Sequence, residues 1–280
     1  MRQMPWRELA GMSWTELDRL DRERCVIFMS AGPLEQHGPH LPVGTDIFAA
    51  EEMTRRVMQI VAEQLDWTLL LAPTMLYGSA VLSRPYPGTV SVRRRVQVDF
   101  CTDVLQSFVD NGFSWLIVTT QHMDPPYILA WEEACQRVNA HGGRALHGYE
   151  RLVFDDLFHE GSLSTVTGCD AAGESHAGVF ETSQMLLTHP DLVHTALAAT
   201  LPRVRLDFER DLRRARSWRE LANGLGYTGY PADATAERGE RIYRRYVAQY
   251  APLVLRHLSG EDVWPALTLT RWYALEPSTS

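Results

Sequence analysis

The chain has 280 residues, of which 45% are hydrophobic and 22% are charged, so it holds enough apolar material for a sizeable core. Its formal net charge of -8 provides no basic surface, which argues against nucleic acid or an anionic membrane as a partner. The chain contains no lysine, and this excludes catalysis through a lysine Schiff base.

No segment approaches the roughly 20 uninterrupted apolar residues that a membrane helix requires, and the first residues lack the apolar core of a signal peptide. We therefore expect a cytoplasmic protein. The cysteines are scattered without a CxxC spacing, which argues against a zinc ribbon or a disulfide framework. We interpret all of them as small core residues: Cys25, Cys101, Cys135 and Cys169.

Short apolar runs rich in β-forming residues alternate with longer amphipathic segments. The runs predict buried strands at 25–31, 68–74, 115–120 and 144–149. The segments between them have apolar residues at helical spacing and predict helices at 46–65, 91–111 and 127–141. This βαβ alternation indicates an α/β fold in which helices cover both faces of a mostly parallel sheet. No linker divides the chain, so we expect one domain over residues 1–280.

Two further helices are expected toward the C-terminus. One opens in the segment 174–183 and runs to about Leu187. The other covers 237–258 and is expected to be interrupted or kinked at Pro252, because proline removes a backbone donor. The residues after Ser259 include prolines and polar side chains, and we expect the last of them to be frayed.

Two pairs of potential metal ligands follow predicted strands. Glu35 and His37 come directly after the first predicted strand. His122 and Asp124 follow the third. Because alternate residues of an extended segment project to one side, the members of each pair can converge, and both pairs lie at carboxyl ends of parallel strands, where open sheets bind ligands. The loop rich in glycine and proline that follows the first pair can return Asp46 to the same point.

These five residues supply two imidazoles and three carboxylates, a ligand set that suits Zn²⁺ or Mn²⁺ better than Ca²⁺. They exceed the needs of one tetrahedral zinc, whereas two ions sharing a bridging carboxylate would use all of them and activate a water molecule. The alternative is that each pair is a surface coincidence, because short motifs often match by chance. Two such pairs at equivalent strand ends favour the two-metal centre.

A third group of polar residues opens the helix expected near 174–183. His176 could act as a general acid, since an imidazole that titrates near neutrality can protonate a leaving nitrogen. Glu181 could be a further metal ligand or could orient a neighbour. The alternatives are a histidine packed on backbone and a glutamate that caps the helix locally.

Five motifs are spread over most of the chain: GPLEQHGPHLPVGTD (32–46), YPGTVSV (86–92), QHMD (121–124), SHAGVFETSQML (175–186) and GYTGYPADATAERGE (226–240). In these motifs the chain resembles the creatininase, or creatinine amidohydrolase, family of binuclear metal hydrolases. The resemblance implies a three-layer α/β/α sandwich and a homo-oligomer, commonly a hexamer. It also implies two divalent ions, Zn²⁺ foremost, with Mn²⁺ or Fe²⁺ as alternatives.

The resemblance assigns roles to residues. The implied ligands are Glu35, Asp46 and His122 for one metal and His37, Asp46 and Asp124 for the other, with Asp46 as the bridge. His176 and Glu181 match the active-site histidine and glutamate of the family, where the histidine transfers a proton.

Two departures from the family pattern bear on the substrate. Asp124 stands where creatininase has a longer glutamate, and the segment 171–174 (AAGE) lacks the Trp-Asp-Gly stretch associated with creatinine binding. The expected reaction is therefore cleavage of a C–N bond in a small cyclic amide or formamide other than creatinine, without an organic cofactor. The alternatives are a peptidase like the one that trims the mycofactocin precursor peptide, and a binding or assembly subunit that has lost catalysis.

Overall fold

The computed structural model describes residues 4–158, 161–207, 211, 217–222 and 224–263. Its centre is a five-stranded sheet in which neighbouring strands are parallel. In spatial order the strands are β1 (Arg7–Glu8), β3 (Thr68–Leu71), β2 (Cys25–Ala31), β4 (Trp115–Thr120) and β5 (Arg144–His147). β2 and β4 pair along their length, so the loops that follow them leave the same edge of the sheet.

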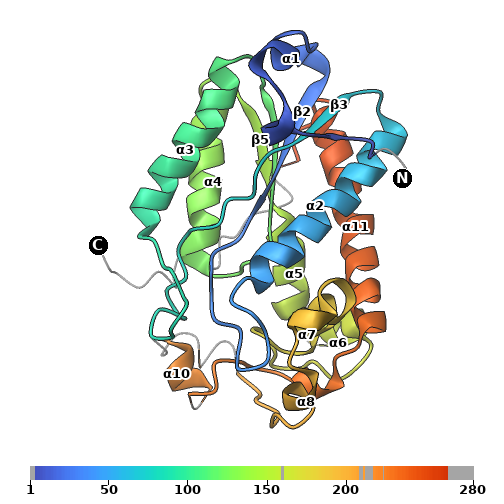
Figure 1. Cartoon of the computed structure of the whole chain (residues 1–280). Coiled ribbons are helices and arrows are strands. Elements are labelled where there is room, and N and C mark those ends of the chain that lie inside the picture. The colour runs from blue at the N-terminus through green and yellow to red at the C-terminus, as the bar shows by residue number, and fades with distance from the viewer. Residues whose placement is uncertain (1–3, 159–160, 208–210, 212–216, 223, 264–280) are drawn as a thin grey trace.

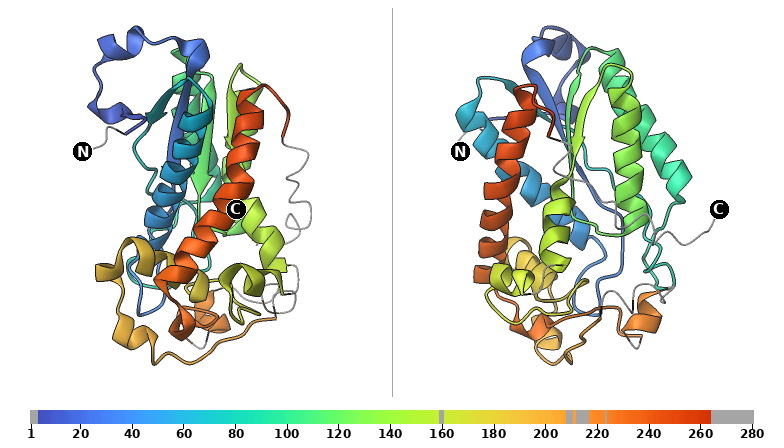
Figure 2. Two further views of the ribbon diagram at one scale, coloured as in Figure 1. Left: turned by 90° about the vertical axis from the view of Figure 1, so that its right-hand side faces the viewer. Right: turned by 180° about the vertical axis from the view of Figure 1, so that it is seen from behind.

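Helices cover both faces of this sheet, as the two turned views show (Figures 1 and 2). One face is covered by α2 (Thr45–Gln64) and α11 (Ala236–Leu258). The other face is covered by α3 (Arg94–Asp110) and α4 (Pro125–Asn139). The predicted three-layer α/β/α sandwich is therefore confirmed.

The sequence of β2 explains the two covered faces. Val26 and Phe28 belong to the core beneath α2 and α11, whereas Ile27 and Met29 belong to the core beneath α3 and α4. Successive side chains of a strand point to opposite faces, and every residue of β2 is buried. A continuous apolar run is thus what a parallel sheet with two covered faces requires.

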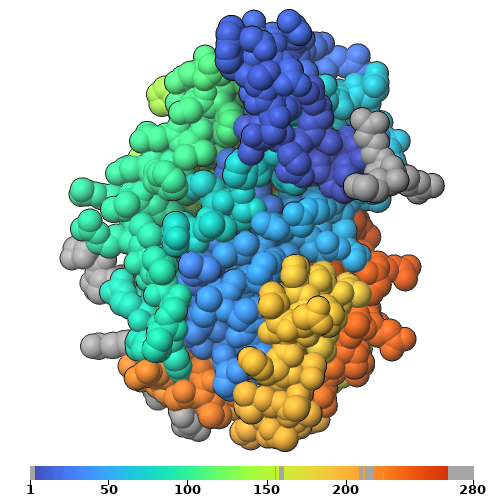
Figure 3. All heavy atoms as spheres, in the orientation of Figure 1, coloured from blue at the N-terminus to red at the C-terminus, as the bar shows by residue number. Residues whose placement is uncertain are grey.

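The shorter elements complete the fold. They are η1 (Leu9–Gly11), α1 (Trp14–Asp18), η2 (Arg22–Arg24), α5 (Tyr149–Phe158), α6 (Ser162–Thr167), α7 (Val179–Thr188), η3 (Pro190–Leu192), α8 (Thr195–Ala198), α10 (Trp218–Leu221) and η4 (Pro231–Asp233). Figure 1 shows α6, α7, α8 and α10 gathered at the end of the molecule toward which β2 and β4 run. Figure 3 shows the segment around α7 lying on the surface beside α2 and α11.

The predicted elements are confirmed with small differences at their ends. The strands at 25–31 and 115–120 have the predicted bounds, whereas β3 ends at Leu71 and β5 ends at His147. Of the interruption or kink predicted at Pro252, the interruption is wrong, because α11 continues through the proline. Tyr250 and Val254 are buried on either side of the proline, and this packing offsets the missing backbone hydrogen bond. The predicted fraying of the last residues lies outside the described residues.

Candidate metal centre

The loop after β2 returns to the start of α2 and brings Asp46 to Glu35. The backbone N–H of Glu35 donates to the carbonyl of Val43 at 2.9 Å, which closes the loop on itself. A Cβ on Gly32 would lie 3.0 Å from the backbone of Asp46, so any larger residue would push against the start of α2. Asp46 then lies in the first turn of α2, where a carboxylate is favoured by the helix dipole.

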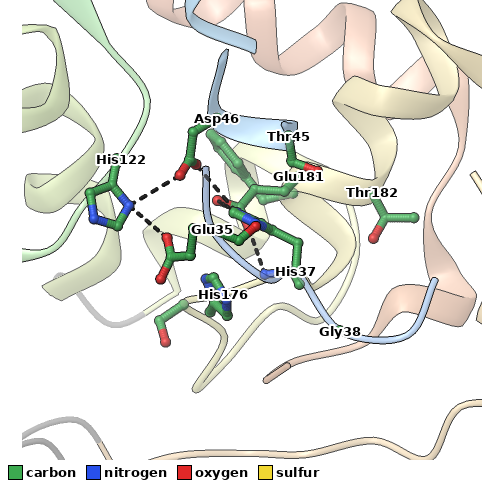
Figure 4. A network of polar contacts seen from close by, with 12 residues as sticks. Glu35, His37, Gly38, Thr45, Asp46, His122, His176, Glu181 and Thr182 are labelled. Atoms are coloured by element: carbon green, nitrogen blue, oxygen red, sulfur yellow. Dashed lines mark hydrogen bonds and ion pairs between the residues drawn. The ribbon is translucent and has the colours of Figure 1, made fainter. Parts of the chain in front are cut away.

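Two histidines are oriented by backbone carbonyls. Nδ1 of His37 donates to the carbonyl of Glu35 at 3.0 Å, and Nε2 of His122 donates to the carbonyl of Ser79 at 3.0 Å. Each bond requires a proton on the donating nitrogen, so the other ring nitrogen is the one without a proton whenever the imidazole is neutral. In both residues that nitrogen faces the carboxylates of the cluster (Figure 4). This is the arrangement of a metal-ligating imidazole with an outer hydrogen-bond partner.

Asp46 lies between the two imidazoles. Its Oδ1 is 3.3 Å from Nε2 of His37, and its Oδ2 is 3.1 Å from Nδ1 of His122. Oε2 of Glu35 is 2.8 Å from the same nitrogen of His122. In the part of the chain that the structure describes, Asp46 Oδ2, Glu35 Oε2 and His37 Nε2 are buried and accept or donate no hydrogen bond. Buried nitrogen and oxygen atoms that form no hydrogen bond and face one another in ion pairs fit a site for divalent ions.

The electrostatics of the cluster show what balances its charge. Burial alone would lower the pKa of His37, but the carboxylates of Asp46 and Glu181 raise it well above its ordinary value. Burial would likewise lower the pKa of His122, and Glu35 and Asp46 raise it. Without another cation, the carboxylates are neutralised by protonated imidazoles. Divalent ions would take the place of those protons.

Glu181 reaches the cluster from the first turn of α7. One carboxylate oxygen accepts the backbone N–H of Ala177, and Oε1 lies 3.7 Å from Nε2 of His37. Ala177 has a φ of 52°, a left-handed conformation that strains a residue with a side chain. The tight turn places its N–H beneath Glu181, and the carboxylate is thereby aimed at His37.

Asp124 takes a different direction. Its Oδ2 accepts the backbone N–H of Val81 at 2.6 Å and lies 3.8 Å from Nε2 of His122, the nitrogen already bonded to Ser79. Burial raises the pKa of Asp124 to about 6, although His122 and backbone donors oppose the shift.

Three groups of possible ligand atoms lie within 4.8 Å of one another among the described residues: Glu35, Asp46 and His122; His37, Asp46 and Glu181; and Glu35, His37 and His176. The structure therefore brings together the first ligand set expected from the sequence. In the second set it brings Glu181 to His37, in the place expected for Asp124.

His176 lies beside this cluster and is held by three segments. Its backbone N–H donates to Oγ1 of Thr228 at 3.1 Å, and its Nε2 donates to the carbonyl of Gln36 at 2.8 Å. Its ring is 4.4 Å from that of His37 and is stacked on that of Trp218. Burial lowers the pKa of His176, and His37 lowers it further.

Glu174, rather than His176 or Glu181, caps α7. Its carboxylate accepts the backbone N–H groups of Val179 and Phe180 at 2.8 and 2.6 Å. A Cβ on Gly178 or Gly229 would lie within 2.5 Å of its side chain, so the glycines of these two motifs leave room for the cap. Burial raises the pKa of Glu174 to about 8, although the backbone donors lower it.

A cavity of ≈ 50 Å³ opens onto the cluster. Its polar wall includes Glu35, Asp46 and His122, and its apolar wall includes Leu82, Phe154 and Trp218. A chemical group that enters the cavity therefore meets the candidate metal ligands on one side and nonpolar side chains on the other.

Three residues of this site have no role in the predictions from sequence. Gln36 and Thr228 lie inside the quoted motifs, so the resemblance could have pointed to them. Trp218 follows an arginine-rich segment and carries no local signal. Its contact with His176 exists only because the chain folds back over the loop at 79–86.

The fold and the site together define a class of protein: a parallel α/β sandwich with buried imidazoles and carboxylates at the carboxyl edge of its sheet, where a metal centre can form. The family model for creatininase, described as creatinine amidohydrolase, matches residues 10–254. The chain belongs to the creatininase family, and the resemblance seen in its motifs is confirmed.

Individual relatives agree with this membership. The mycofactocin precursor peptide peptidase of Mycobacterium ulcerans (strain Agy99) is 29% identical over 253 residues, covering 84% of this chain and 87% of that protein. Its counterpart in Mycolicibacterium smegmatis is 30% identical over 239 residues, covering 82% and 85%. The creatinine amidohydrolase of Pseudomonas putida is 26% identical over 199 residues, covering 65% and 72%.

Solved structures show the same fold. A structure titled "Creatininase Mn" superposes with a TM-score of 0.71 at 20% identity and covers 89% of this chain and 98% of that chain. Within the described residues, no helix is long and apolar enough to cross a membrane.

Proposed function

We propose that this chain is a metal-dependent hydrolase that cleaves the C–N bond of an amide, within one domain. Glu35, Asp46 and His122 would hold one divalent ion, and His37, Asp46 and Glu181 would hold a second. The observation that carries the proposal is that the two oxygens of Asp46 face imidazole nitrogens of two different histidines. A carboxylate in this position is suited to bridge two ions.

The donor set favours Zn²⁺, with Mn²⁺ or Fe²⁺ as alternatives, because imidazole and carboxylate suit these ions. A divalent pair would polarise the amide carbonyl and lower the pKa of water. The chain itself delivers the proton to the departing nitrogen. Nε2 of His176 donates to the carbonyl of Gln36, and burial lowers the pKa of this imidazole. Once His176 has taken a proton from the attacking water, the protonated ring gives that proton up readily to the departing nitrogen.

The comparisons favour a peptide amide as the substrate. The relatives named as mycofactocin precursor peptide peptidases align over more of both chains, and at higher identity, than the relative named as a creatinine amidohydrolase. We therefore place a peptide bond first and a small cyclic amide or formamide second. Creatinine is not among the proposed substrates.

A hydrolysis screen of the protein loaded with Zn²⁺ or Mn²⁺ tests the proposal. The panel contains short peptides, formamides and lactams, and Asp46→Ala protein is the blank. We expect the native chain, but not Asp46→Ala protein, to release amines from peptides. If the native chain binds two ions and releases no amine from any compound, the alternative of a non-catalytic binding or assembly subunit is correct.

We also propose that the chain forms a cytoplasmic homo-oligomer, with a hexamer as the assembly that family resemblance implies. Light scattering should give a multiple of the 31.8 kDa chain mass. A particle with the mass of one chain would contradict this proposal without affecting the assignment of the metal ligands.

A further inference from the structure

A parallel ring contact lies beside the proposed active site. The indole of Trp218 and the imidazole of His176 are parallel within 2°, and their centroids are 4.8 Å apart. Trp218 is 6% exposed and His176 is 5% exposed, so the contact is shielded from water. Stacked aromatic pairs of this kind contribute beyond the area that they bury.

Trp218 is fixed by contacts that do not involve His176. Its backbone N–H donates to the carbonyl of Leu82 at 2.9 Å. The guanidinium of its neighbour Arg219 lies 5.0 Å from the centre of the Tyr86 ring. α10 is therefore anchored on the loop at 79–86, which also supplies the carbonyl that orients a candidate metal ligand. The indole is in this way a rigid surface against which the imidazole can rest.

The other contacts of His176 do not by themselves fix the rotation of its ring about the Cβ–Cγ bond. Its backbone is held by Thr228, which donates its N–H to the carbonyl of His176 at 2.7 Å. Its Nε2 donates to the carbonyl of Gln36 at 2.8 Å, and the amide nitrogen of the Gln36 side chain lies 3.0 Å from the same ring nitrogen. Because Nε2 lies off the axis of the Cβ–Cγ bond, a turn of the ring about that bond moves Nε2, and the contacts with Gln36 limit this rotation only in part. The ring of His37 is tilted by 43° to that of His176 and does not define its plane.

We propose that Trp218 is the positioning residue of His176: its indole holds the imidazole in the plane from which the proton reaches the leaving nitrogen, and it walls the cavity on that side. The proposal rests on the amide hydrolysis proposed above. Trp218 and His176 both line the ≈ 50 Å³ cavity next to Glu35 and Asp46. A turned ring would carry its nitrogen away from the substrate, and small misplacements of a catalytic group are costly.

Tryptophan fluorescence tests the contact without any activity. An imidazole in contact with an indole quenches its emission, so His176→Asn should brighten the otherwise native protein. The brightening should disappear when the same substitution is made in a Trp218→Phe background, although the other tryptophans remain. An unchanged emission in His176→Asn, or an equal brightening in the Trp218→Phe background, would show that the stack is not formed.

Kinetics test the positioning role. Trp218→Leu should lower kcat by about 10- to 100-fold with KM changed far less, and Trp218→Phe should restore most of the loss because it keeps a stacking ring. In the His176→Asn background, Trp218→Leu should add almost nothing, since residues that act through one another are not additive. Trp14→Leu is the control, because that side chain is 76% exposed at the far end of the molecule.

Metal content and thermal melting of each variant separate these effects from misfolding. If Trp218→Leu does not fold, Trp218→Phe and the fluorescence comparison still decide the question. Independent, multiplying losses in the double variant would overturn the proposal. If no variant hydrolyses any amide, the proposed function has failed and the positioning role fails with it, whereas the fluorescence comparison still decides whether the stack between Trp218 and His176 is formed.

Discussion

The ligand candidates at the ends of β2 and β4 differ from a second buried pair of histidine and carboxylate at the end of β5. In this second pair, Nδ1 of His147 lies 3.2 Å from Oε1 of Glu150, and both side chains are fully buried. The two residues are three apart in the sequence and come from one turn of the chain. The ligand candidates come instead from the loop at 32–46, the end of β4 and the start of α7.

The two regions also differ in charge. Burial lowers the pKa of His147 well below its ordinary value and raises that of Glu150 to about 7, so both groups tend to the neutral form. At His37, burial acts in the same direction, but two carboxylates outweigh it and raise the pKa well above its ordinary value. Burial by itself neutralises a pair, whereas several carboxylates converging on an imidazole preserve charge. Convergence from distant elements is therefore what makes a site for a divalent cation.

The largest effect that separates the two regions should come from Asp46→Ala. Because a bridging carboxylate serves both ions, elemental analysis should show the metal content falling from about two ions per chain to nearly none, with loss of hydrolysis. Glu150→Gln, in the other cluster, is the matched control and should keep the metal content of the native chain. Retention of one ion in Asp46→Ala would mean that Asp46 is a terminal ligand.

His176→Asn should give the next largest effect, because it removes a proton donor and leaves the ligands in place. Both ions should remain bound while turnover falls by about 10² to 10⁴. The loss should shrink for activated anilides or esters, whose leaving groups depart without protonation. Equal losses across the series of leaving groups, or loss of metal, would show that His176 has another role.

Glu181→Gln and Asp124→Asn form a matched pair that tests which carboxylate joins His37. In competition with a chelator, Glu181→Gln should lower the affinity for one ion by more than 10- to 100-fold. A loss of 10- to 100-fold is typical of residues that only hydrogen-bond to a metal ligand. Asp124→Asn should weaken binding by less, since its carboxylate accepts a backbone N–H that an amide oxygen can also accept. If Asp124→Asn empties the site that His37→Ala empties, the pairing implied by family resemblance holds instead.

The smallest effect concerns stability at Glu150. Its pKa of about 7 in the folded chain lies above the ordinary value of 4.5, so the folded state binds more protons between these values. The free energy of unfolding should therefore fall as the pH rises through this window. From pH 5 to pH 8 the native chain should therefore lose free energy of unfolding that Glu150→Gln keeps. The difference in free energy of unfolding between the two should shift in favour of Glu150→Gln by an amount on the order of 3 kcal/mol.

Urea unfolding at both pH values measures this difference, and the exposed Glu63→Gln is the control that should show none of it. If the difference in free energy of unfolding between Glu150→Gln and the native chain is the same at both pH values, Glu150 is not neutral in the folded chain.

Much of the architecture could be predicted from local patterns. The apolar runs of β2 and β4 identify buried strands because each residue of such a run must face a covered side of the sheet. The positions of Glu35, His37 and His122 follow from these strands, since parallel strands deliver their carboxyl ends to one edge. Spacing along the chain was sufficient there because the ligands lie within a few residues of the elements that carry them.

Other parts of the site depend on contacts between segments that lie far apart in the sequence. Family resemblance implies that Asp124 is the partner of His37, whereas in the structure the carboxylate of Asp124 accepts the N–H of Val81 and the turn at Ala177 aims Glu181 at His37. Trp218 meets His176 because α10 docks on the loop at 79–86. Such directions are decided by backbone donors and neighbouring rings that tertiary packing supplies, and no local periodicity encodes them.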